Sequence, residues 1–400
     1  MPRTPLSLLV ELGEWSQSWT KVPRTGKTAA DSVPQTNLGP AVAADVFLNQ
    51  LQGPSPRYSI ALAAVDTTGM IHVNYLLPGN NDAWVGWQAV PGAFRSAQVP
   101  VSAMAIEGKL YLYAVGLDEV VIQNGHQTWL YGHVYWNSTT DGDVWSGWTQ
   151  VSGVEKTKTP VSASPDGSLF LVGLHGGVWI NSSPTTDAGG WTLLRSQFES
   201  AGNNKPFDTN VGVAIGAGNS YPDSAVGPVL FGKPAGNHNI LALSASGAAE
   251  WAPLPDGESG ATNRAIATAR FSQGGYAAGF AGGSFLFLTT SDNEINCSSP
   301  YFSDPANGQA TYAPTPSGTL SWSSIPGLRT NATPGAAVSI ADTGGRELVS
   351  QTVYLFAKGV DSEASSGDIW YNSMVFGVVS ATGPVLPPVK EHINSSGFAR

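Results

Sequence analysis

Four short segments of the chain place an aromatic residue or a histidine two positions before an asparagine, and this pair could do chemistry. A flat ring can stack on the C–H face of a sugar, and an amide can donate to and accept from sugar hydroxyls. The pairs contain no carboxylate, lysine or arginine, so they suit a neutral ligand. They are His72 and Asn74, Tyr135 and Asn137, Trp179 and Asn181, and Trp370 and Asn372.

Two tryptophans are further candidates for ligand contact, because Trp84 and Trp145 each follow a polar loop and begin a strand. Trp87 and Trp148, three residues later, are predicted instead to wedge between neighbouring repeats, where burying a large ring contributes about 1.5–3 kcal/mol. A structural interpretation of the ring-and-asparagine pairs stays open. In it, the ring packs between repeats and the asparagine ends its strand by bonding its own turn.

The sequence offers little for catalysis or metal binding. Six histidines are scattered without metal-ligand spacing, and no G-x-S-x-G motif occurs. Residues 227–234, "GPVLFGKP", resemble a phosphate-binding loop, but Pro234 stands where that loop needs Ser or Thr. We therefore predict no cofactor and no metal. A pair of carboxylates for glycoside hydrolysis stays open, and its candidates are Asp45, Asp66, Asp118 and Glu119.

The elements that must position these residues recur along the chain. Six segments end on a tryptophan, at positions 19, 87, 148, 191, 251 and 322. Between them recur a Pro-led or Asn-led strand of small residues, an aliphatic and aromatic strand, and the strand of the ring-and-asparagine pair. In the fourth and fifth repeats, "GNHNILALS" and "GQATYAP" match that third strand loosely. Self-similar segments of this length indicate a repeat architecture.

Four short strands repeated six times predict an all-β fold, a β-propeller of six four-stranded blades, with seven blades as the alternative. The first tryptophan segment precedes every other element, and the last three elements lack one. We therefore expect the amino-terminal strand, residues 1–20, to complete the last blade and close the ring, which removes exposed sheet edges. Residues 1–400 then form one domain, and residues 380–400 form a tail.

The strands "TPVSASPDGSLFLVGLHGGVWINSS" and "WSGWTQVSG" resemble the repeat of propeller lectins of the Photorhabdus and Psathyrella type. The layout is also similar to that of fungal six-bladed fucose-binding lectins, which use an Arg and a Glu in each site. This chain departs from them, since Arg57 and Arg346 are the arginines that precede a second strand. Residues 138–145, "STTDGDVW", resemble the Asp-box of sialidase propellers, which is a folding turn in that family.

The composition of the chain disfavours some classes of binding partner. Charged residues make up 12% of the chain and the net charge is −10, which disfavours nucleic acid and anionic membranes. Cys297 is the single cysteine, so no internal disulfide forms. No window reaches a membrane span or a signal peptide. We expect a soluble protein, cytoplasmic or released without a cleaved signal peptide.

These observations favour a lectin that binds glycans or glycoconjugates through several shallow sites per ring, and they leave a homo-oligomer open. Two alternatives stay open beside it. One is a propeller glycoside hydrolase or lyase with a single site over the central channel. The other is a scaffold that binds proteins on the faces of the ring. A propeller fold hosts all three, so the fold alone does not choose between them.

Overall fold

All the secondary structure described in this protein is β-strand. The computed structural model describes residues 9–29, 31, 33–46, 59–77, 83–106, 108–123, 126–164, 167–186, 189–195, 206–208, 211–216, 229–235, 241–244, 252–253, 266–271, 283–298, 301–303, 310–312, 322–340, 348–360 and 367–379. In these ranges no helix has the length and hydropathy that crossing a membrane requires.

The strands of the first three blades follow one another along the chain. Blade 1 contains β3 (Ala41–Val46), β4 (Ser59–Val65), β5 (Ile71–Leu77), β6 (Ala83–Trp84) and β7 (Gln88–Ala89). Blade 2 contains β8 (Ser102–Ile106), β9 (Lys109–Val115), β12 (Val134–Thr139) and β13 (Thr149–Gln150). Blade 3 contains β14 (Ser162–Ala163), β15 (Leu169–Val172), β16 (Val178–Asn181) and β17 (Thr192–Arg195).

The last three blades repeat this order. Blade 4 contains β18 (Ala214–Gly216), β19 (Val229–Gly232), β20 (Leu241–Ser244) and β21 (Ala252–Pro253). Blade 5 contains β22 (Ala267–Phe271), β23 (Gly283–Thr289), β24 (Glu294–Ser298) and β27 (Trp322–Arg329), with β25 (Tyr301–Ser303) and β26 (Ala310–Tyr312) added through β23. Blade 6 contains β28 (Gly335–Ile340), β29 (Leu348–Lys358) and β30 (Ile369–Val379), with β1 (Leu9–Leu12) and β2 (Thr20–Lys21) paired to β30.

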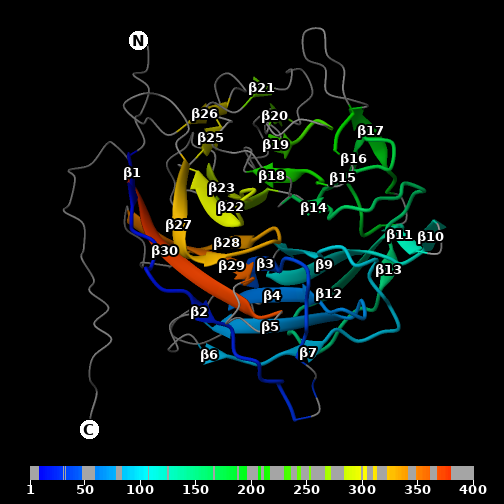
Figure 1. Cartoon of the computed structure of the whole chain (residues 1–400), viewed down its shortest axis with the longest axis horizontal. Coiled ribbons are helices and arrows are strands. Elements are labelled where there is room, and N and C mark those ends of the chain that lie inside the picture. The colour runs from blue at the N-terminus through cyan, green and yellow to red at the C-terminus, as the bar shows by residue number, and fades with distance from the viewer. Residues whose placement is uncertain are drawn as a thin grey trace.

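The six sheets of the described residues close into a ring, which confirms the β-propeller. The first strand of each blade contacts the first strand of the next, from β3 through β8, β14, β18, β22 and β28 back to β3. Within a blade, successive strands pair antiparallel from the centre outward. Figure 1 shows the blades arranged around the inner strands, with the small hairpin of β10 (Glu119–Gln123) and β11 (His126–Tyr131) at one side.

The inner strands carry small residues because neighbouring blades approach closely at the axis. A Cβ atom added to Gly39 would lie 1.8 Å from the carbonyl oxygen of Thr333. One added to Gly335 would lie 2.4 Å from the carbonyl oxygen of Pro40. Glycine at these two positions therefore permits a backbone contact that a side chain would block.

Hydroxyl groups join some inner strands across the gap between blades. Ser102 of blade 2 donates a hydrogen bond to the carbonyl oxygen of Val161 in blade 3, and Ser162 donates to that of Val213 in blade 4. A bond of this kind contributes about 0.5–1.5 kcal/mol to stability. The repeated Pro-Val-Ser sequence thus has a structural use at the centre of the ring.

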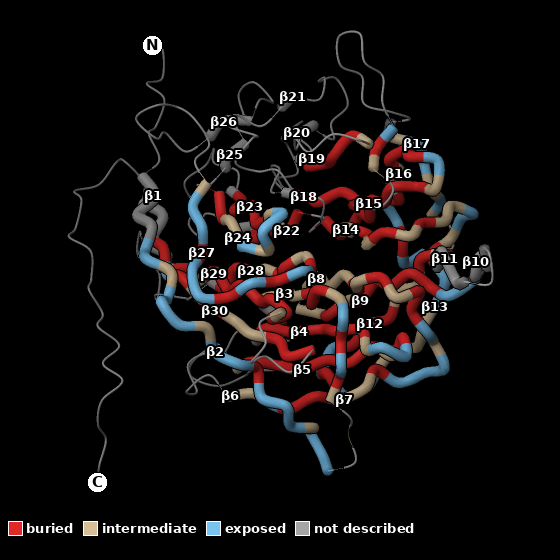
Figure 2. The backbone as a smooth tube through the Cα atoms, in the orientation of Figure 1, coloured by how far each residue is buried: buried red, intermediate tan, exposed pale blue. Residues whose placement is uncertain are grey.

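The second strand of each blade forms the core, because neighbouring blades cover both of its faces. Such strands are predicted as continuous apolar runs, not as alternating ones. Residues with no exposed surface include Leu62, Leu112, Phe170, Leu286 and Leu355. Figure 2 shows the buried residues along these strands, with exposed residues on outer strands and loops.

The amino-terminal strand closes the ring, as predicted, because it supplies an outer strand to the last blade. In β2, Thr20 pairs with Tyr371 and Lys21 pairs with Trp370 of β30, which Figure 1 shows as a blue strand beside an orange-red one. Asp368, whose side chain is 1% exposed, lies 2.6 Å from Lys21 Nζ and 3.3 Å from Arg24 Nη1. Residues 380–400, the predicted tail, lie outside the described residues.

A tryptophan on one blade covers the end of the preceding blade, and we call this contact the Trp–Gly latch. The covered glycines have positive φ, and they lie in an outer strand or just after one. A Cβ atom on the glycine would lie 2.7–3.3 Å from the Cδ1 atom of the tryptophan. The described latches are Trp148 on Gly92, Trp191 on Gly153 and Trp19 on Gly327. Related bonds run from the Trp19 indole N–H to Pro326 and from the Trp87 indole N–H to Pro23.

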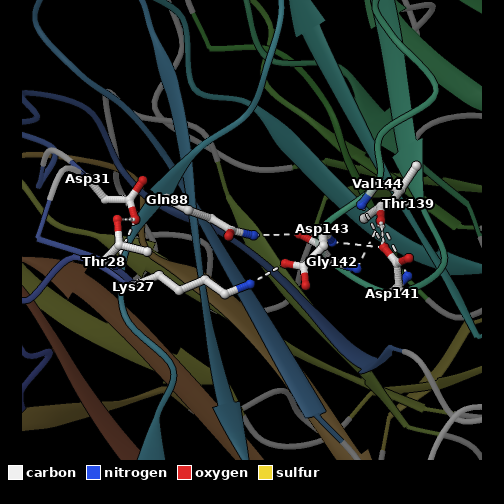
Figure 3. A network of polar contacts seen from close by, with 9 residues as sticks. All are labelled: Lys27, Thr28, Asp31, Gln88, Thr139, Asp141, Gly142, Asp143 and Val144. Atoms are coloured by element: carbon white, nitrogen blue, oxygen red, sulfur yellow. Dashed lines mark hydrogen bonds and ion pairs between the residues drawn. The ribbon is translucent and has the colours of Figure 1, made fainter.

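The stretch that resembles an Asp-box is a turn held by its own side chains (Figure 3). Asp141 accepts hydrogen bonds from the backbone N–H groups of Asp143 and Val144, both at 2.8 Å. Those bonds lower the pKa of the Asp141 carboxyl. Lys27 pairs with Asp143, so the turn also ties the amino-terminal segment to blade 2. Its acids are therefore engaged in folding contacts.

Blade 5 corrects one strand assignment made from the sequence. The third strand of this blade is β24, with the sequence "EINCS", and not the "GQATYAP" segment. Within that segment, β26 pairs with β25 beyond the four regular strands. The hairpin of β10 and β11 is a second addition that the repeat pattern did not predict. Insertions of this kind break the periodicity from which strands are assigned.

Candidate functional site

The four asparagines predicted to contact a ligand lie inside their blades, no more than 2% exposed. In three blades the amide bonds the segment between two tryptophans of the outer strand. Asn74 Oδ1 accepts the N–H of Gly86 at 2.9 Å, and Asn137 Oδ1 accepts the hydroxyl of Ser146 at 3.1 Å. This is the geometry of the structural interpretation.

The other two asparagines also bond backbone groups. Asn372 Nδ2 donates to the carbonyl oxygen of Ser16 at 2.9 Å. Asn181 accepts the N–H of Ser183 at 3.0 Å and donates to the carbonyl oxygen of Ser152. A ligand would have to open the blade to reach any of these amides.

The predicted rings divide into buried and partly exposed groups. His72 has no exposed surface and bonds Asp66 Oδ2 at 3.0 Å. Trp84 packs edge-on against Phe356 and Tyr371 of blade 6, at centroid distances of 6.1 and 5.8 Å. Burial thus removes His72 from solvent, whereas Trp84 is half-buried and packs in the contact between blades.

The remaining four rings are half-buried. Trp145 packs against the core shared by blades 1 and 2, and Trp370 against the core of blades 5 and 6. Lys21 Nζ lies over the Trp370 ring, 6.0 Å from its centroid. Tyr135 and Trp179 lie where two blades meet, beside titratable side chains. These last two rings therefore mark the candidate sites.

The first junction site lies between blades 1 and 2 and contains Phe94, Gly116, Asp118, His133 and Tyr135. Asp118 Oδ2 accepts the backbone N–H of His133 at 2.6 Å and lies 2.5 Å from His133 Nδ1. The Tyr135 hydroxyl lies 3.3 Å from Asp118 Oδ1. The carboxylate is thus already engaged by the protein.

Aromatic rings form one wall of the first junction site. The Phe94 ring lies 5.1 Å from that of Tyr135 and stacks on that of Trp148 at 4.4 Å, measured between centroids. Burial, followed by the charge and hydrogen bond of Asp118, raises the pKa of the Tyr135 hydroxyl. A Cβ atom on Gly116 would lie 2.5 Å from the Tyr135 ring. Glycine is therefore needed beneath this ring.

The second junction site lies between blades 2 and 3 and contains Glu155, Gly173, His175 and Trp179. A Cβ atom on Gly173 would lie 2.2 Å from Glu155 Oε1 and 2.8 Å from Trp179 Nε1. An acceptor and a donor therefore flank one point above the glycine. Neither the carboxylate nor the indole N–H has a hydrogen bond or ion pair in the described part of the chain.

The carboxylate of the second junction site is partly buried, and this burial raises its pKa. Both Glu155 and Trp179 are half-buried, whereas His175 is exposed. Burial raises the pKa of the Glu155 carboxyl, and the nearby His175 opposes that shift only in part. A half-buried acceptor beside a free donor can bind two neighbouring hydroxyls, while the indole face packs on C–H groups.

Of the four acids proposed for a channel site, the structure describes the side chains of Asp66 and Asp118, and each bonds its own neighbours. Asp66 bonds the hydroxyl of Thr68 at 2.7 Å and His72, and these bonds outweigh burial and lower the pKa of its carboxyl. Asp118 belongs to the first junction site. The side chains of Asp45 and Glu119 lie outside the described residues. Within the described ranges, no group of three or more His, Cys, Asp or Glu residues could hold a metal ion.

Sequence reasoning missed Glu155, Gly173, His133 and His175 as site residues. A weak signal was present, since "VGLD" at 115–118 and "VGLH" at 172–175 repeat the end of a second strand. The glycines of this repeat are Gly116 and Gly173, which lie beneath the two rings. The linker residue Glu155 lies beside Gly173 and Trp179 only because two blades meet there, and the sequence does not show that contact.

No family model matches this chain, and no curated protein matches it in sequence. Among solved structures, it is similar to AofleA from Arthrobotrys oligospora, at 10% identity over 88% of this chain and 97% of that one, with a TM-score of 0.48. It is similar to the SapL1 lectin in complex with alpha methyl fucoside, at 13% identity over 84% and 95%, with a TM-score of 0.42. It is also similar to a Trypanosoma rangeli sialidase in complex with sialic acid, at 9% identity over 93% of this chain and 59% of that one, with a TM-score of 0.45. Such scores assign no function.

Proposed function

We propose that this protein binds carbohydrate, and that neutral sugars occupy the sites at the blade junctions. The observation that carries the proposal is the free pair of Glu155 carboxylate and Trp179 indole N–H above Gly173. Neighbouring sugar hydroxyls fit such a pair, because one donates to the carboxylate while the next accepts from the indole. The aromatic wall of the first junction site supports the same ligand class.

The proposal keeps two of the predicted ring residues, Tyr135 and Trp179, as ligand contacts. The asparagine partners and His72 serve the ring of blades instead, since they are buried and bonded. Single shallow sites should bind at millimolar to micromolar strength, about −4 to −8 kcal/mol. Several sites on one rigid ring can raise avidity about 10²- to 10⁴-fold on a multivalent surface.

A glycan array, combined with a hydrolysis screen on the same sample, tests this function. Trp179→Phe keeps an apolar ring but removes the indole N–H, so binding to arrayed glycans should fall several-fold. Trp370→Phe is the matched control, because Trp370 lies in blade 6 away from both sites. Unchanged binding in Trp179→Phe would remove the second junction site from the proposal. Turnover of a glycoside, or binding to no glycan, would replace the lectin with one of its alternatives.

A further inference from the structure

The acids of the two junction sites differ in the hydrogen-bond partners that the protein gives them. At the first site, His133 contacts the Asp118 carboxylate at 2.5 Å, and a backbone N–H adds a second bond. At the second site, the Glu155 carboxylate has no such contact among the residues that the structure describes. Burial removes water from this charge without replacing it by a partner, which is unfavourable for a carboxylate.

The described cations near Glu155 in the sequence are directed elsewhere. Lys156, its neighbour in the chain, places Nζ over the Tyr131 ring, 5.9 Å from the centroid. Lys158 interacts with Asp208 of the next junction. His175 faces the carboxylate from blade 3, but it is exposed and offsets the burial only in part. The negative charge above Gly173 is thus left for a ligand to neutralise.

A neutral sugar would satisfy the hydrogen bonds of this site but not its charge. An ammonium group would do both, since a charge-assisted hydrogen bond to a carboxylate is roughly twice as strong as a neutral one. The face of Trp179 adds to this, because a cation within about 6 Å of an indole ring is attracted by its π electrons. An acetylated amine keeps the shape but loses the charge.

We propose that the second junction site selects a sugar that carries a free primary amine, with its ammonium bound to Glu155 and its ring against Trp179. This inference rests on the proposed function and refines it. The first junction site, whose carboxylate is already paired, takes the neutral sugar. Adjacent junctions of one ring therefore recognise different sugars, and a glycan with both kinds of residue would bridge them.

The test compares binding of the intact protein to beads that carry glucosamine, N-acetylglucosamine or glucose on the same linker. At about pH 7 the carboxylate is ionised, and binding to glucosamine beads should exceed binding to glucose beads about 10-fold. Glu155→Gln should bring that ratio close to one, because it removes the charge on which the preference for an ammonium group depends. Gly173→Ala should have a similar effect, since a methyl group would displace the carboxylate. Each variant is compared with the parent by thermal melting.

A protein of net charge −10 attracts any cation weakly, so beads carrying ethanolamine are the control. Equal binding to ethanolamine and glucosamine, unchanged in Glu155→Gln, would overturn the inference as general charge attraction. Equal binding to the three sugars would overturn it as well, but would leave the proposed carbohydrate function standing. Binding to none of the sugars would overturn both.

Discussion

The two junction sites share one ground plan but exchange the positions of acid and ring. Phe94 and Glu155 each stand two residues after a glycine that the next tryptophan covers. At the first site this linker position supplies a ring, and the loop after the second strand supplies the acid, Asp118. At the second site the linker supplies the acid, and the loop supplies His175. The shared blade geometry thus determines which positions lie close together, whereas the residue types at those positions differ between the two sites.

Deleting residues 9–28 should have the largest effect, because it breaks both junction sites at once. The deletion removes the outer strand of blade 6 and also Lys21 and Arg24, which contact the buried Asp368. Asp368 is buried but Lys21 and Arg24 are partly exposed, so losing these ion pairs should cost less than the about 3–5 kcal/mol of a fully buried pair. We expect aggregation and loss of the cooperative transition in calorimetry. A truncated protein that melts like the parent would show that ring closure does not support the sites.

The second-largest effect should come from removing the latch tryptophans, and its size should differ between the two junctions. Trp148→Ala should lower the free energy of unfolding by about 3 kcal/mol, since the ring covers Gly92 and also stacks on Phe94. Trp191→Ala should cost about 1 kcal/mol less, because its linker counterpart is Glu155 and no aromatic pair is lost. Urea denaturation of both variants measures the difference. Equal losses would mean that the Phe94 stack contributes little.

The substitution Phe94→Glu should give the first site the linker carboxylate of the second site, with a moderate loss in the free energy of unfolding. It replaces a ring that stacks on Trp148 and lies tilted against Tyr135 by a carboxylate near Asp118. We expect a loss of about 1–3 kcal/mol in the free energy of unfolding. Glu155→Phe is the reciprocal control and should not lose stability, because it removes an uncompensated charge. If Glu155→Phe is the costlier change, the correspondence of the two positions fails.

The smallest expected effect is a gain of stability in Glu155→Gln. Burial raises the pKa of the Glu155 carboxyl above its unfolded value, so its ionised form destabilises the folded state as pH rises. The glutamine variant should therefore melt slightly higher at about pH 7, by less than about 1 kcal/mol because the group is partly exposed. The advantage should disappear below about pH 4, where both side chains are neutral. Melting curves across this range decide it, and an advantage that persists in acid would point to another cause.

Much of the ring could be predicted from sequence because its signals are local. A second strand such as that of Leu110 to Val115 is apolar throughout, and Gly108 and Gly116 lie close to its two ends. The order of the tryptophan segments also predicted closure by the amino-terminal strand. Blade 5 was harder, because β25 and β26 are inserted between its third and fourth strands. An insertion shifts the spacing on which repeat assignment depends.

The candidate site was less predictable because a ring beside an asparagine has the same pattern whether it binds sugar or holds a blade. Asn137 bonds Ser146, which lies just before the outer strand, a contact that sequence spacing does not show. Glu155 lies in a linker without periodicity, and its partners Gly173 and Trp179 belong to the next blade. The sites arise between repeats, whereas sequence patterns describe each repeat by itself.

The Trp–Gly latch has a consequence for assembly. A segment such as "WTQVSG" carries both halves of the contact, since Trp148 covers the glycine behind it and Gly153 receives the tryptophan ahead. This is a heterologous, head-to-tail interface, the kind that builds cyclic oligomers when its rotation closes. The six blades thus resemble the subunits of a cyclic hexamer that are linked in a single chain. A fragment of three blades would carry one vacant half at each end, and two such fragments would complete a circle.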